Sequence, residues 1–417
     1  MPRQLLDWLR PWYHGIAAYG AGWYYGRPSA RLAVVGITGT AGKSSTAAML
    51  SAILNAAGRK CGYMTTVNFF DGQADELNKH GLSMPGGPRL QRHLKKIADN
   101  GCEFAIVECT SEGLAQNRHV GIKFAAALLT NLSPAHLEAH GSFENYRAAK
   151  AKLFKRAPMI GVNLDSQEAG YFLAFDASRK FGVSFSGNAN PQAKKVYAAA
   201  GRPGGFMLDG QEFELRLPGD FNRQNAALAA ACADMLGVDL PAAVRALNEF
   251  AGIPGRMELV PNHLGITVVV DYGCEPVSIR AALRAAAAMP HRRLIHVFGA
   301  TGGHRDKFKR GDFGQASAAW ADLSIITNDD VYDSDPQEIA QATARGIEQA
   351  RDRKPGHRYL TQLDRGLAIS QALRAAGPGD LVLITGKGSE QFLILPGNQR
   401  VPWDDRKTAK AVLANLV

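Results

Sequence analysis

Cysteines are few in this 417-residue sequence, and none of them forms a C-x-x-C pair. The five cysteines are scattered and odd in number, which argues against a disulfide framework and against a thiolate zinc site. A signal-peptide pattern is also missing, because the start MPRQLLDWLRPWYHG has no clean apolar core before a small-residue cleavage site. We therefore predict a reducing, cytoplasmic compartment.

Acidic residues are fewer than basic ones. The sequence has 38 Asp and Glu against 48 Lys and Arg, and a net charge of +10 suits an acidic small molecule, a nucleotide or an anionic membrane surface. No aromatic-basic repeat or zinc-finger spacing accompanies the charge, which disfavours nucleic acid as a partner. Hydrophobic residues make up 46% of the chain, so packed cores are expected, and the length indicates two or three domains.

Strand-like runs alternate with helix-like runs along most of the chain. RLAVVGIT precedes the helix-like SSTAAMLSAILNAAG, and EFAIVECT and KFAAALLTNLS are further strand-like runs. Residues 176–218 indicate a small antiparallel excursion, and a second alternation begins after residues 252–255. This pattern predicts an α/β protein, with a P-loop central domain on a mostly parallel sheet and a C-terminal Rossmann-like α/β domain. The expected ranges are 1–30 for a short aromatic N-terminal segment, 31–252 for the central ATP-binding domain and 253–417 for the C-terminal domain.

The N-terminal segment allows two interpretations. From Pro11 to Gly26 the chain reads PWYHGIAAYGAGWYYG, with no charged residue except His14, and Arg10 and Arg27 flank it. The stretch is too short to span a bilayer. Residues 1–30 could make a peripheral contact at a membrane interface, or form a first helix that packs on the next domain. The many glycines favour the packed helix.

The stretch GITGTAGKSST predicts a phosphate-binding loop. It departs from the common pattern G-x-x-x-x-G-K-[ST], because Ile37 stands where the first glycine is expected. Gly39 and Gly42 still allow backbone amides to curl around an anion. Lys43 can reach terminal phosphates, and Ser44 can ligate magnesium at the start of a helix. A glycine-rich turn without a ligand is the alternative, disfavoured because a strand precedes the loop and a helix follows it.

Four further residues are weak candidates when each is judged alone. Glu108 follows a strand-like run in AIVECTSEG, at the carboxyl end where ligands of parallel sheets gather. His136 and His140 lie four residues apart in NLSPAHLEAHGS, but the order is not the H-E-x-x-H of zinc proteases. Lys150, in ENYRAAKAKLF, would ordinarily be an exposed helical lysine. Their significance depends on the motifs around them.

In their order along the chain, these segments resemble the Mur ligase family, whose members use ATP to add amino acids to the peptidoglycan precursor: GITGTAGKSST, IVECTSEGL, TNLSPAHLEAHGSFENYRAAKAKLF, GDFNRQNAALAA, GIPGRME, VVVDYG, VFGATGGHRDKFKR, ITNDD and ITGKGSEQ. The similarity covers roughly Arg31 to the carboxyl terminus. It is greatest to the UDP-N-acetylmuramoyl-tripeptide synthetase (MurE) type. A family loop of the form T-G-T-x-G-K-[ST] accounts for Ile37.

The resemblance implies a reaction and a set of site residues. ATP phosphorylates a substrate carboxylate, and an amine then displaces the phosphate to form an amide. Catalytic roles are implied for Lys43, Glu108, His136 and Lys150. Magnesium ligation is implied for Ser44, Glu108, His136 and a carbamate carried by Lys150. Nucleotide contacts are implied for Gly39, Thr40, Ala41, Gly42, Lys43, Ser44, Ser45, Asn225, Arg256 and Asp271. Contacts with the incoming amino acid are implied for Arg305, Asp329, Asp330 and Glu390.

Two departures from the family pattern bear on the substrates. Only about thirty residues precede the loop, which is too few for the family's UDP-binding domain, so a muropeptide, a lipid-linked precursor or another peptide becomes the expected acceptor. The family's Asp-Asn-Pro-Arg, found in diaminopimelate-adding members, is replaced here by Asp329, Asp330, Val331 and Tyr332. A tyrosine cannot pair with a distal carboxylate as an arginine does. The change favours an amino acid with a second amine, such as lysine.

The leading prediction is an ATP- and Mg²⁺-dependent carboxylate–amine ligase that joins an amino acid to a muramoyl-peptide or related cell-wall acceptor. A folylpolyglutamate-type or other peptide ligase is a second interpretation, disfavoured by GHRDKFKR and GKGSEQ. A regulatory ATP-binding protein without ligase activity is a third, and it would predict damage at Glu108, His136 or Lys150. All three residues are present.

Overall fold

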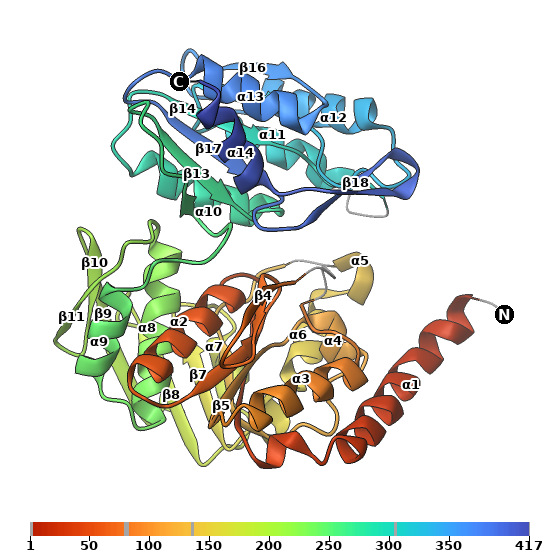
Figure 1. The fold of residues 1–417 in the computed structure, drawn as a ribbon, viewed down its shortest axis with the longest axis vertical. Helices are drawn as coiled ribbons and strands as arrows, with labels where there is room; N and C mark the ends of the chain where they lie inside the picture. Colours follow the sequence, from red (N-terminus) through yellow and green to blue (C-terminus); the bar gives the residue numbers. More distant parts are fainter. Residues whose placement is uncertain (1–2, 79–82, 135–136, 304–306, 417) are drawn as a thin grey trace. The chain divides into compact units, whose positions relative to one another are not determined.

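The computed structural model describes residues 3–78, 83–134, 137–303 and 307–416. The chain divides into two compact units (Figure 1), unit 1 with Met1–Arg216 and Phe221–Ala251, and unit 2 with Leu217–Asp220 and Gly252–Val417. The predicted ranges differ from these units at residues 217–220 and 252, which group with unit 2, and at residues 1–30, which group with unit 1. Each unit has a mostly parallel sheet covered by helices, which confirms the predicted α/β class.

Within the described residues, unit 1 is built on an 11-stranded sheet in the order β11-β10-β9-β8-β7-β6-β1-β5-β2-β3-β4. Its strands are β1 (Ala33–Thr38), β2 (Cys61–Met64), β3 (Asn68–Phe70), β4 (Asp75–Leu77), β5 (Phe104–Glu108), β6 (Phe124–Leu129), β7 (Met159–Asn163), β8 (Arg179–Ser184), β9 (Lys195–Arg202), β10 (Gly205–Leu208) and β11 (Gln211–Glu214). The strands from β9 to β2 pair in parallel, and the outer strands β10, β11, β3 and β4 pair antiparallel. The predicted antiparallel excursion is therefore present, but only beyond β8, which belongs to the parallel part.

The helices of unit 1 cover this sheet. They are α1 (Arg3–Tyr24), η1 (Pro28–Ala30), α2 (Lys43–Ala56), α3 (Gly87–Asp99), α4 (Ser111–Ala115), α5 (Leu137–His140), α6 (Phe143–Ala151), η2 (Phe154–Arg156), α7 (Ala169–Leu173), α8 (Asp220–Met235) and α9 (Leu240–Asn248). Helix α6 begins where the Ser142 hydroxyl accepts a hydrogen bond from the Asn145 amide, an N-cap that fixes where the helix starts.

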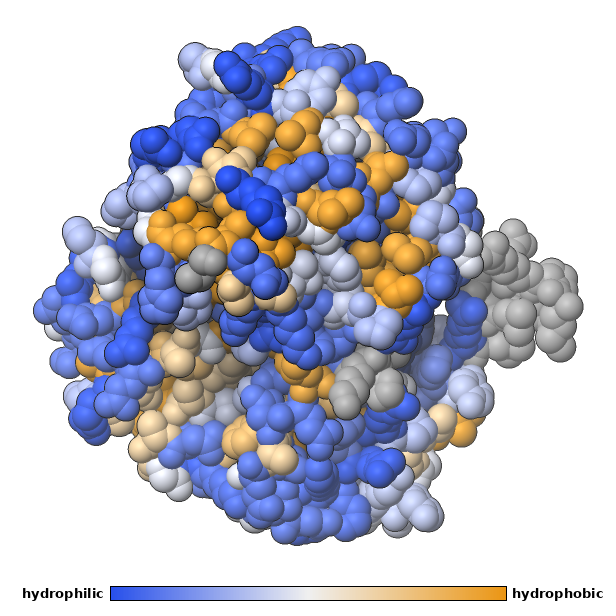
Figure 2. Space-filling model, turned by 45° about the horizontal axis from the view of Figure 1, so that its top comes forward, coloured by the Kyte–Doolittle hydropathy of each residue, from blue (hydrophilic) through white to orange (hydrophobic). Residues whose placement is uncertain are grey.

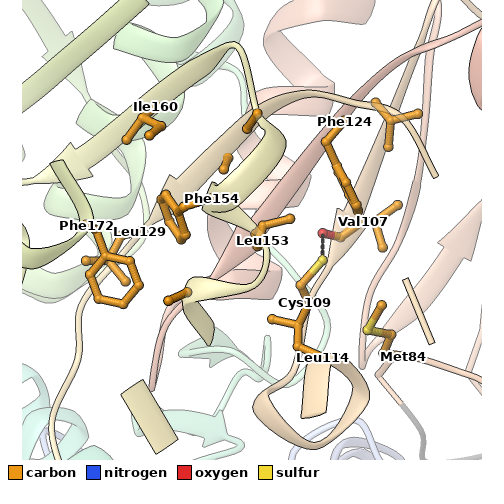
Figure 3. Close-up of a cluster of buried hydrophobic side chains, with 14 of the residues drawn as sticks. Met84, Val107, Cys109, Leu114, Phe124, Leu129, Leu153, Phe154, Ile160 and Phe172 are labelled. Atoms are coloured by element: carbon orange, nitrogen blue, oxygen red, sulfur yellow. Dashed lines mark hydrogen bonds between the residues drawn. The ribbon is translucent and has the colours of Figure 1, made fainter. Parts of the chain in front are cut away.

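The core of unit 1 positions the strand that enters the phosphate loop. Phe124, Leu153 and Phe154 are among the buried side chains that pack together there (Figure 3). At Gly36 of β1, an added Cβ would lie 2.5 Å from Leu153 Cδ1 and 2.9 Å from Phe124 Cε1. The core therefore leaves no room for a side chain at this point of β1, which fixes the strand against η2 and β6.

Unit 2 has a 6-stranded sheet in its described residues, in the order β12-β13-β17-β14-β15-β16. Its strands are β12 (Glu258–Leu259), β13 (Thr267–Asp271), β14 (Leu294–Phe298), β15 (Leu323–Ile326), β16 (Arg358–Thr361) and β17 (Leu381–Thr385), followed by the hairpin β18 (Phe392–Leu395) and β19 (Gln399–Pro402). The helices are α10 (Pro276–Ala287), η3 (Lys307–Lys309), α11 (Arg310–Ala318), α12 (Pro336–Glu348), α13 (Arg365–Ala375), η4 (Pro396–Asn398) and α14 (Asp405–Ala414). Pairing is parallel except between β12 and β13 and within the hairpin, as in a Rossmann-like sheet.

Candidate functional site

Glycines give the phosphate loop its shape. Gly42 has φ 84°, a left-handed conformation that favours glycine, and α2 begins at the next residue. An added Cβ would lie 2.2 Å from Asn225 Oδ1 at Gly42, and 2.0 Å from Thr130 Oγ1 at Gly39. Side chains at these positions would fill the space that the loop encloses. The loop is thus a cradle whose backbone approaches β6 and α8 closely.

Asn131 holds the middle of the loop. Its Oδ1 accepts a hydrogen bond from the Ala41 amide at 3.0 Å, and its Nδ2 donates to the Ala41 carbonyl at 3.1 Å. Thr130, the preceding residue, donates from its hydroxyl to the same carbonyl at 2.6 Å. The sequence analysis missed both residues, although they stand in the segment TNLS that carries part of the resemblance. They follow β6, so the neighbouring strand fixes the loop.

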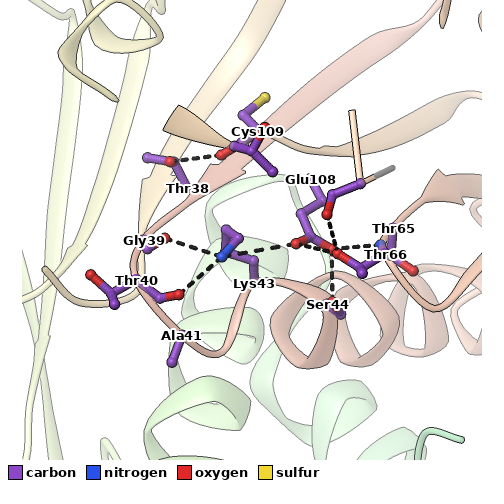
Figure 4. A network of polar contacts seen from close by, with 12 residues as sticks. Thr38, Gly39, Thr40, Ala41, Lys43, Ser44, Thr65, Thr66, Glu108 and Cys109 are labelled. Carbon is purple, nitrogen blue, oxygen red and sulfur yellow. Dashed lines mark hydrogen bonds and ion pairs between the residues drawn. The ribbon is translucent and has the colours of Figure 1, made fainter. Parts of the chain in front are cut away.

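Lys43, Ser44 and Glu108 come together at the start of α2 (Figure 4). The Ser44 hydroxyl donates to Glu108 Oε2 at 2.7 Å, and Lys43 Nζ lies 3.9 Å from Glu108 Oε1. Lys43 Nζ also donates to the carbonyls of Gly39 and Thr40, each at 3.1 Å. Parallel pairing of β1 with β5 places the end of β5, where Glu108 stands, next to the loop. The structure therefore brings these three predicted site residues together.

Thr66 fixes the Glu108 carboxylate in place. Its amide donates to Oε2 at 2.9 Å, and its hydroxyl donates to Oε1 at 2.9 Å. Glu108 is buried, and these bonds compensate for the lost solvation of the carboxylate. The sequence contains no signal for Thr66, because it stands after β2 in an ordinary TTVN turn. The parallel β2–β5 pairing brings it to Glu108.

Lys150 is buried beside the loop. Its Nζ donates to the Gly39 carbonyl at 2.8 Å, and the described residues offer it no ion pair. Burial lowers the pKa of Lys150 well below its ordinary value, the positive charge of Lys43 lowers it further, and Glu108 opposes the shift. The exposed helical lysine that the sequence suggests is thus a buried amine whose charged form is disfavoured.

Tyr146 links Lys150 to the loop. The Lys150 ammonium lies 4.6 Å from the centre of the Tyr146 ring, and the Tyr146 hydroxyl is 3.0 Å from the Thr40 hydroxyl. Tyr146 and Lys150 are four residues apart on α6, so they occupy the same face of the helix. Sequence reasoning missed Tyr146, although it stands in the motif FENYRAAK and its spacing to Lys150 was readable.

The geometry fits a bound nucleotide phosphate and a magnesium ion. Asn225 Nδ2 is buried beside Gly42 and has no hydrogen-bond partner among the residues described here. An orphaned amide donor at a glycine cradle and a lysine at the same loop are suited to an anion. Ser44 and Glu108 supply oxygen atoms, the ligand type that Mg²⁺ prefers.

Two predicted site residues, His136 and Arg305, lie outside the described residues. Within the part of the chain that the structure describes, no three His, Cys, Asp or Glu side chains gather as a metal site. The predicted magnesium ligands include His136, which lies outside the described residues, and a modified Lys150, so this absence does not bear on the predicted set. Ser45 is buried in the first turn of α2, next to Ser44.

Arg256 and Asp271 lie near one another in unit 2. The Arg256 guanidinium lies 4.0 Å from the centre of the Tyr272 ring. Asp271 ends β13, and its carboxylate accepts hydrogen bonds from the amides of Met257 at 2.9 Å and Gly273 at 2.7 Å. Burial raises the pKa of Asp271, and the charge of Arg256 opposes that rise. The two residues form a charged group at the carboxyl end of a strand.

A second charge cluster in unit 2 contains the buried Asp329 and Asp330 and the partly buried Glu390. Lys387 Nζ lies 2.8 Å from Asp330 Oδ1 and forms an ion pair with Glu390. Asp329 Oδ2 is buried without a hydrogen-bond partner among the described atoms, and burial raises the pKa of Asp329. Burial lowers the pKa of Lys387, but the carboxylates of Asp329, Glu390 and Asp330 together raise it above its ordinary value. Sequence reasoning named the three acids and missed Lys387, although it stands in GKGSEQ.

A buried salt bridge supports this cluster. Arg365 pairs with Asp405 through two bonds of 2.8 and 2.7 Å, and both side chains are fully buried. The guanidinium also donates to the carbonyls of Asn328 at 3.2 Å and Thr385 at 2.8 Å. These bonds connect the ends of β15 and β17 with the start of α14. The arginine thereby fixes the two loops that carry the acids and Lys387.

Comparisons with known proteins find relatives over most of this chain. Residues 37–233 match the family described as Mur ligase middle domain, and residues 255–388 match the Mur ligase glutamate ligase domain. A UDP-N-acetylmuramyl-tripeptide synthetase of Roseiflexus sp. (strain RS-1) is 35% identical over 94% of this chain and 81% of its own length. A UDP-N-acetylmuramoyl-L-alanyl-D-glutamate--2,6-diaminopimelate ligase of Synechocystis sp. is 36% identical over 97% of this chain and 79% of its own length.

Solved structures show the same fold. A UDP-N-acetylmuramoyl-L-alanyl-D-glutamate--2,6-diaminopimelate ligase aligns with a TM-score of 0.64 at 28% identity, covering 96% of this chain and 83% of its own. A folylpolyglutamate synthase of Mycobacterium tuberculosis aligns with a TM-score of 0.66 at 19% identity, covering 95% of each chain. The second likeness is one of fold alone.

Proposed function

The chain belongs to the Mur ligase family of ATP-dependent carboxylate–amine ligases, and we propose that it joins an amino acid to a muramoyl-peptide or related cell-wall acceptor. The acceptor carboxylate would be activated as an acyl phosphate before the amine attacks. Unactivated carboxylates are poor electrophiles, so this order separates one difficult substitution into two easier ones. The folylpolyglutamate-type alternative rests on a shared fold at 19% identity, which favours no substrate.

The observation that carries the proposal is the cluster of Lys43, Ser44 and Glu108 at the glycine cradle, with Lys150 bonded to the same loop. Phosphoryl transfer between two anions requires positive charge held in place before the reaction. When a nucleotide binds, the Lys43 ammonium would exchange its bonds to the loop carbonyls for contacts with a terminal phosphate. Asn225, with its unpartnered amide, would donate to the nucleotide.

Magnesium would be held by Ser44 and Glu108, with His136 and a carbamate on Lys150 proposed as further ligands. When bound, the ion would neutralise phosphate charge and orient the acceptor carboxylate. The bonds from Thr66 hold the Glu108 carboxylate in one orientation for this task.

The carbamate on Lys150 is supported by burial and by the absence of an ion pair in the described residues. A neutral amine attacks carbon dioxide, a C–N bond forms, and one proton leaves to solvent. The product is an anionic oxygen ligand where a cation stood before. The lowered pKa of Lys150 supplies the neutral amine that this addition requires.

The incoming amino acid would bind at the acidic cluster of unit 2. Three carboxylates, those of Asp329, Asp330 and Glu390, surround one lysine. The excess of negative charge and the unpartnered oxygen of Asp329 favour an amino acid with a second amine, such as lysine. Arg305 is proposed to contact its carboxylate. Arg256 and Asp271 are proposed to contact the nucleotide. A cytoplasmic location also stays a prediction.

The direct test incubates the protein with ATP, Mg²⁺, a panel of muropeptides and lipid-linked precursors, and a panel of amino acids. Phosphate release should depend on both the acceptor and the amino acid, and the acceptor should gain the mass of one amino-acid residue. Lys43→Ala is the matched inactive control. Phosphate release that needs neither partner, with no mass gain, would favour a regulatory ATP-binding protein and contradict the proposal.

A further inference from the structure

Helix α1 has two faces of different composition. Its inner face carries small residues and packs on α3 (Figure 1). Ala18 is fully buried, and a Cβ added to Gly87 of α3 would lie 2.2 Å from the Ala18 Cβ. Gly22, one turn further along, lies against Gln91. The side of α1 that faces unit 1 is therefore already packed.

The outer face of α1 carries large apolar and aromatic residues. Trp12, Ile16, Tyr19 and Trp23 are 64%, 72%, 54% and 58% exposed. Their spacing of four, three and four residues places them in one row along the helix. We call this row the aromatic stripe.

The concentration of these residues is unusual for this protein. Six of the eleven large hydrophobic side chains that are exposed in the described residues lie on α1: the aromatic stripe, Tyr13 and Tyr24. The other five are scattered: Val196, Leu259, Val277, Leu360 and Leu367. On the face that Figure 2 shows, hydrophobic residues lie in several groups that hydrophilic residues border. A contiguous exposed apolar face marks an interaction site, whereas scattered apolar residues do not.

The surroundings of the stripe are basic. No acidic residue occurs between Trp8 and Arg27, and the Arg27 guanidinium lies 3.6 Å from the centre of the Trp23 ring. At the end of α1, Tyr25 lines a cavity of about 670 Å³ together with Arg89 and Arg92 of α3. Both arginines are exposed, and neither has an ion-pair partner in the described part of the chain.

The whole cavity lining has a positive balance. Its basic residues outnumber its acidic ones, and the complete lining is Tyr25, Phe69, Glu76, Leu77, Arg89, Arg92, His93, Lys95, Lys96 and Asp99. Lys95 already pairs with Asp99, and Lys96 pairs with Asp71 at 2.7 Å. Arg89 and Arg92 are therefore the cations left to meet an external anion.

We propose that α1 docks unit 1 on the surface of an anionic lipid bilayer. The aromatic stripe lies at the headgroup level, where Trp and Tyr place a ring in an apolar layer and a polar atom in water. Arg27, Arg89 and Arg92 meet the lipid phosphates. An amphipathic helix with aromatic residues on one face and adjacent arginines is suited to lie in this interface.

A second copy of the chain is a poorer occupant. A two-fold contact through α1 would bring Arg10, Arg27, Arg89 and Arg92 of both copies together, and like charges oppose each other across an interface. The net charge of +10 adds to that repulsion and favours an anionic surface. The helices of the described residues include none with the length and apolar character to cross a bilayer, so the contact is peripheral.

The test uses the full chain and sedimentation with vesicles. Vesicles of equal parts phosphatidylcholine and phosphatidylglycerol should bind the protein, and vesicles of phosphatidylcholine alone should bind it at least tenfold less. The triple variant Trp12→Gln, Tyr19→Gln, Trp23→Gln should lose binding by at least tenfold. Each side chain is largely exposed, so the fold should persist, which thermal unfolding would verify. Arg89→Gln and Arg92→Gln should each weaken binding roughly fivefold at low salt.

A matched control replaces two exposed apolar residues of unit 2, Leu360→Gln and Leu367→Gln, and should bind vesicles as the unchanged chain does. Equal binding by the triple variant and the unchanged chain would overturn the proposal. No binding to the anionic vesicles would also overturn it. A dimer that the triple variant abolishes, seen by sedimentation velocity without vesicle binding, would assign the stripe to a second copy instead.

Discussion

Units 1 and 2 each contain a completely buried lysine, and the pKa values of the two lysines shift in opposite directions. Lys150 of unit 1 donates to a backbone carbonyl and has no ion pair in the described residues, and its pKa is lowered. Lys387 of unit 2 contacts Asp330 and Glu390, and its pKa is raised despite burial. Burial alone does not decide the charge of a lysine. The decisive difference is the presence of carboxylates within contact distance.

The opposite directions of the two pKa shifts suit the two lysines to different roles. An uncharged, buried amine can react with an electrophile such as carbon dioxide. A lysine that contacts Asp330 and Glu390 keeps its own charge and supplies a cation to the acids around it. Lys150 is therefore suited to chemistry, and Lys387 to charge balance.

The largest expected effect is on activity in unit 1. Lys150→Ala should lower the rate of ligation by roughly 10³-fold, because it removes the proposed magnesium ligand from a preorganised site. Phosphate release coupled to acceptor mass gain measures this rate. Lys155→Ala replaces an exposed lysine of the adjacent η2 and should change the rate less than twofold. Unchanged turnover in Lys150→Ala would remove the carbamate proposal.

The next effect is on stability, and it compares the same substitution, Lys to Met, at the two buried lysines. Lys387→Met should destabilise the protein by about 3–5 kcal/mol, because the buried carboxylates of Asp329 and Asp330 and the partly buried one of Glu390 lose their cation. Lys150→Met should leave stability within about 1 kcal/mol or raise it, because the amine has no ion pair to lose. Urea unfolding of both variants gives the two free energies. Equal losses would show that the carboxylates do not determine the difference.

The smallest expected effect concerns the histidines of unit 2. It tests whether the contacts of a buried group, and not the unit in which it lies, decide the direction of its pKa shift. His357 of unit 2 is buried against Ser324 and Arg353, and no carboxylate of the described residues hydrogen-bonds to it, although the charge of Asp322 acts to raise its pKa. Burial, with the charge of Arg353, lowers the pKa of His357 to about 4. His296 is similar, and burial with the charge of Arg365 lowers its pKa to about 3.

The neutral forms of both histidines therefore favour the folded state. Their contribution is complete above the unfolded pKa of about 6.5 and is lost as the pH falls toward the folded values. Stability should decrease by roughly 1–3 kcal/mol between pH 6.5 and 4.5 through each group. His357→Gln should flatten the pH dependence of the melting temperature in this window. An unchanged slope would show that His357 titrates normally.

Motifs predicted the parts of the site that lie within one segment. GITGTAGKSST predicted the loop, and the strand-end position of Glu108 made it a candidate ligand; the structure places its carboxylate at the Ser44 hydroxyl. The sequence carried no signal for Thr66, Arg365 or Asp405. Each of these residues acts on a partner from a distant segment, and its own neighbours in the sequence are ordinary.

The N-terminal segment also separates what the sequence predicted from what only the structure decided. Its composition left a packed helix and a membrane contact as alternatives. The structure has Ala18 and Gly22 packed on α3 and leaves Trp12 and Trp23 exposed, so one helix offers a surface for each role. A period of 3.6 residues allows this division, but only the packing of α3 decides which face stays outside.

The sequence by itself determined the α/β class, the phosphate loop and the family, because glycine spacing and strand–helix alternation are properties of short segments. Tertiary structure alone decided the environments of the two lysines. Parallel pairing of β1 with β5 brought Glu108 to the loop, α6 placed Lys150 against it, and β17 carried Lys387 into a group of acids. The charge on a buried group depends on what surrounds it within a few ångströms, and those neighbours come from segments that are far apart in the chain.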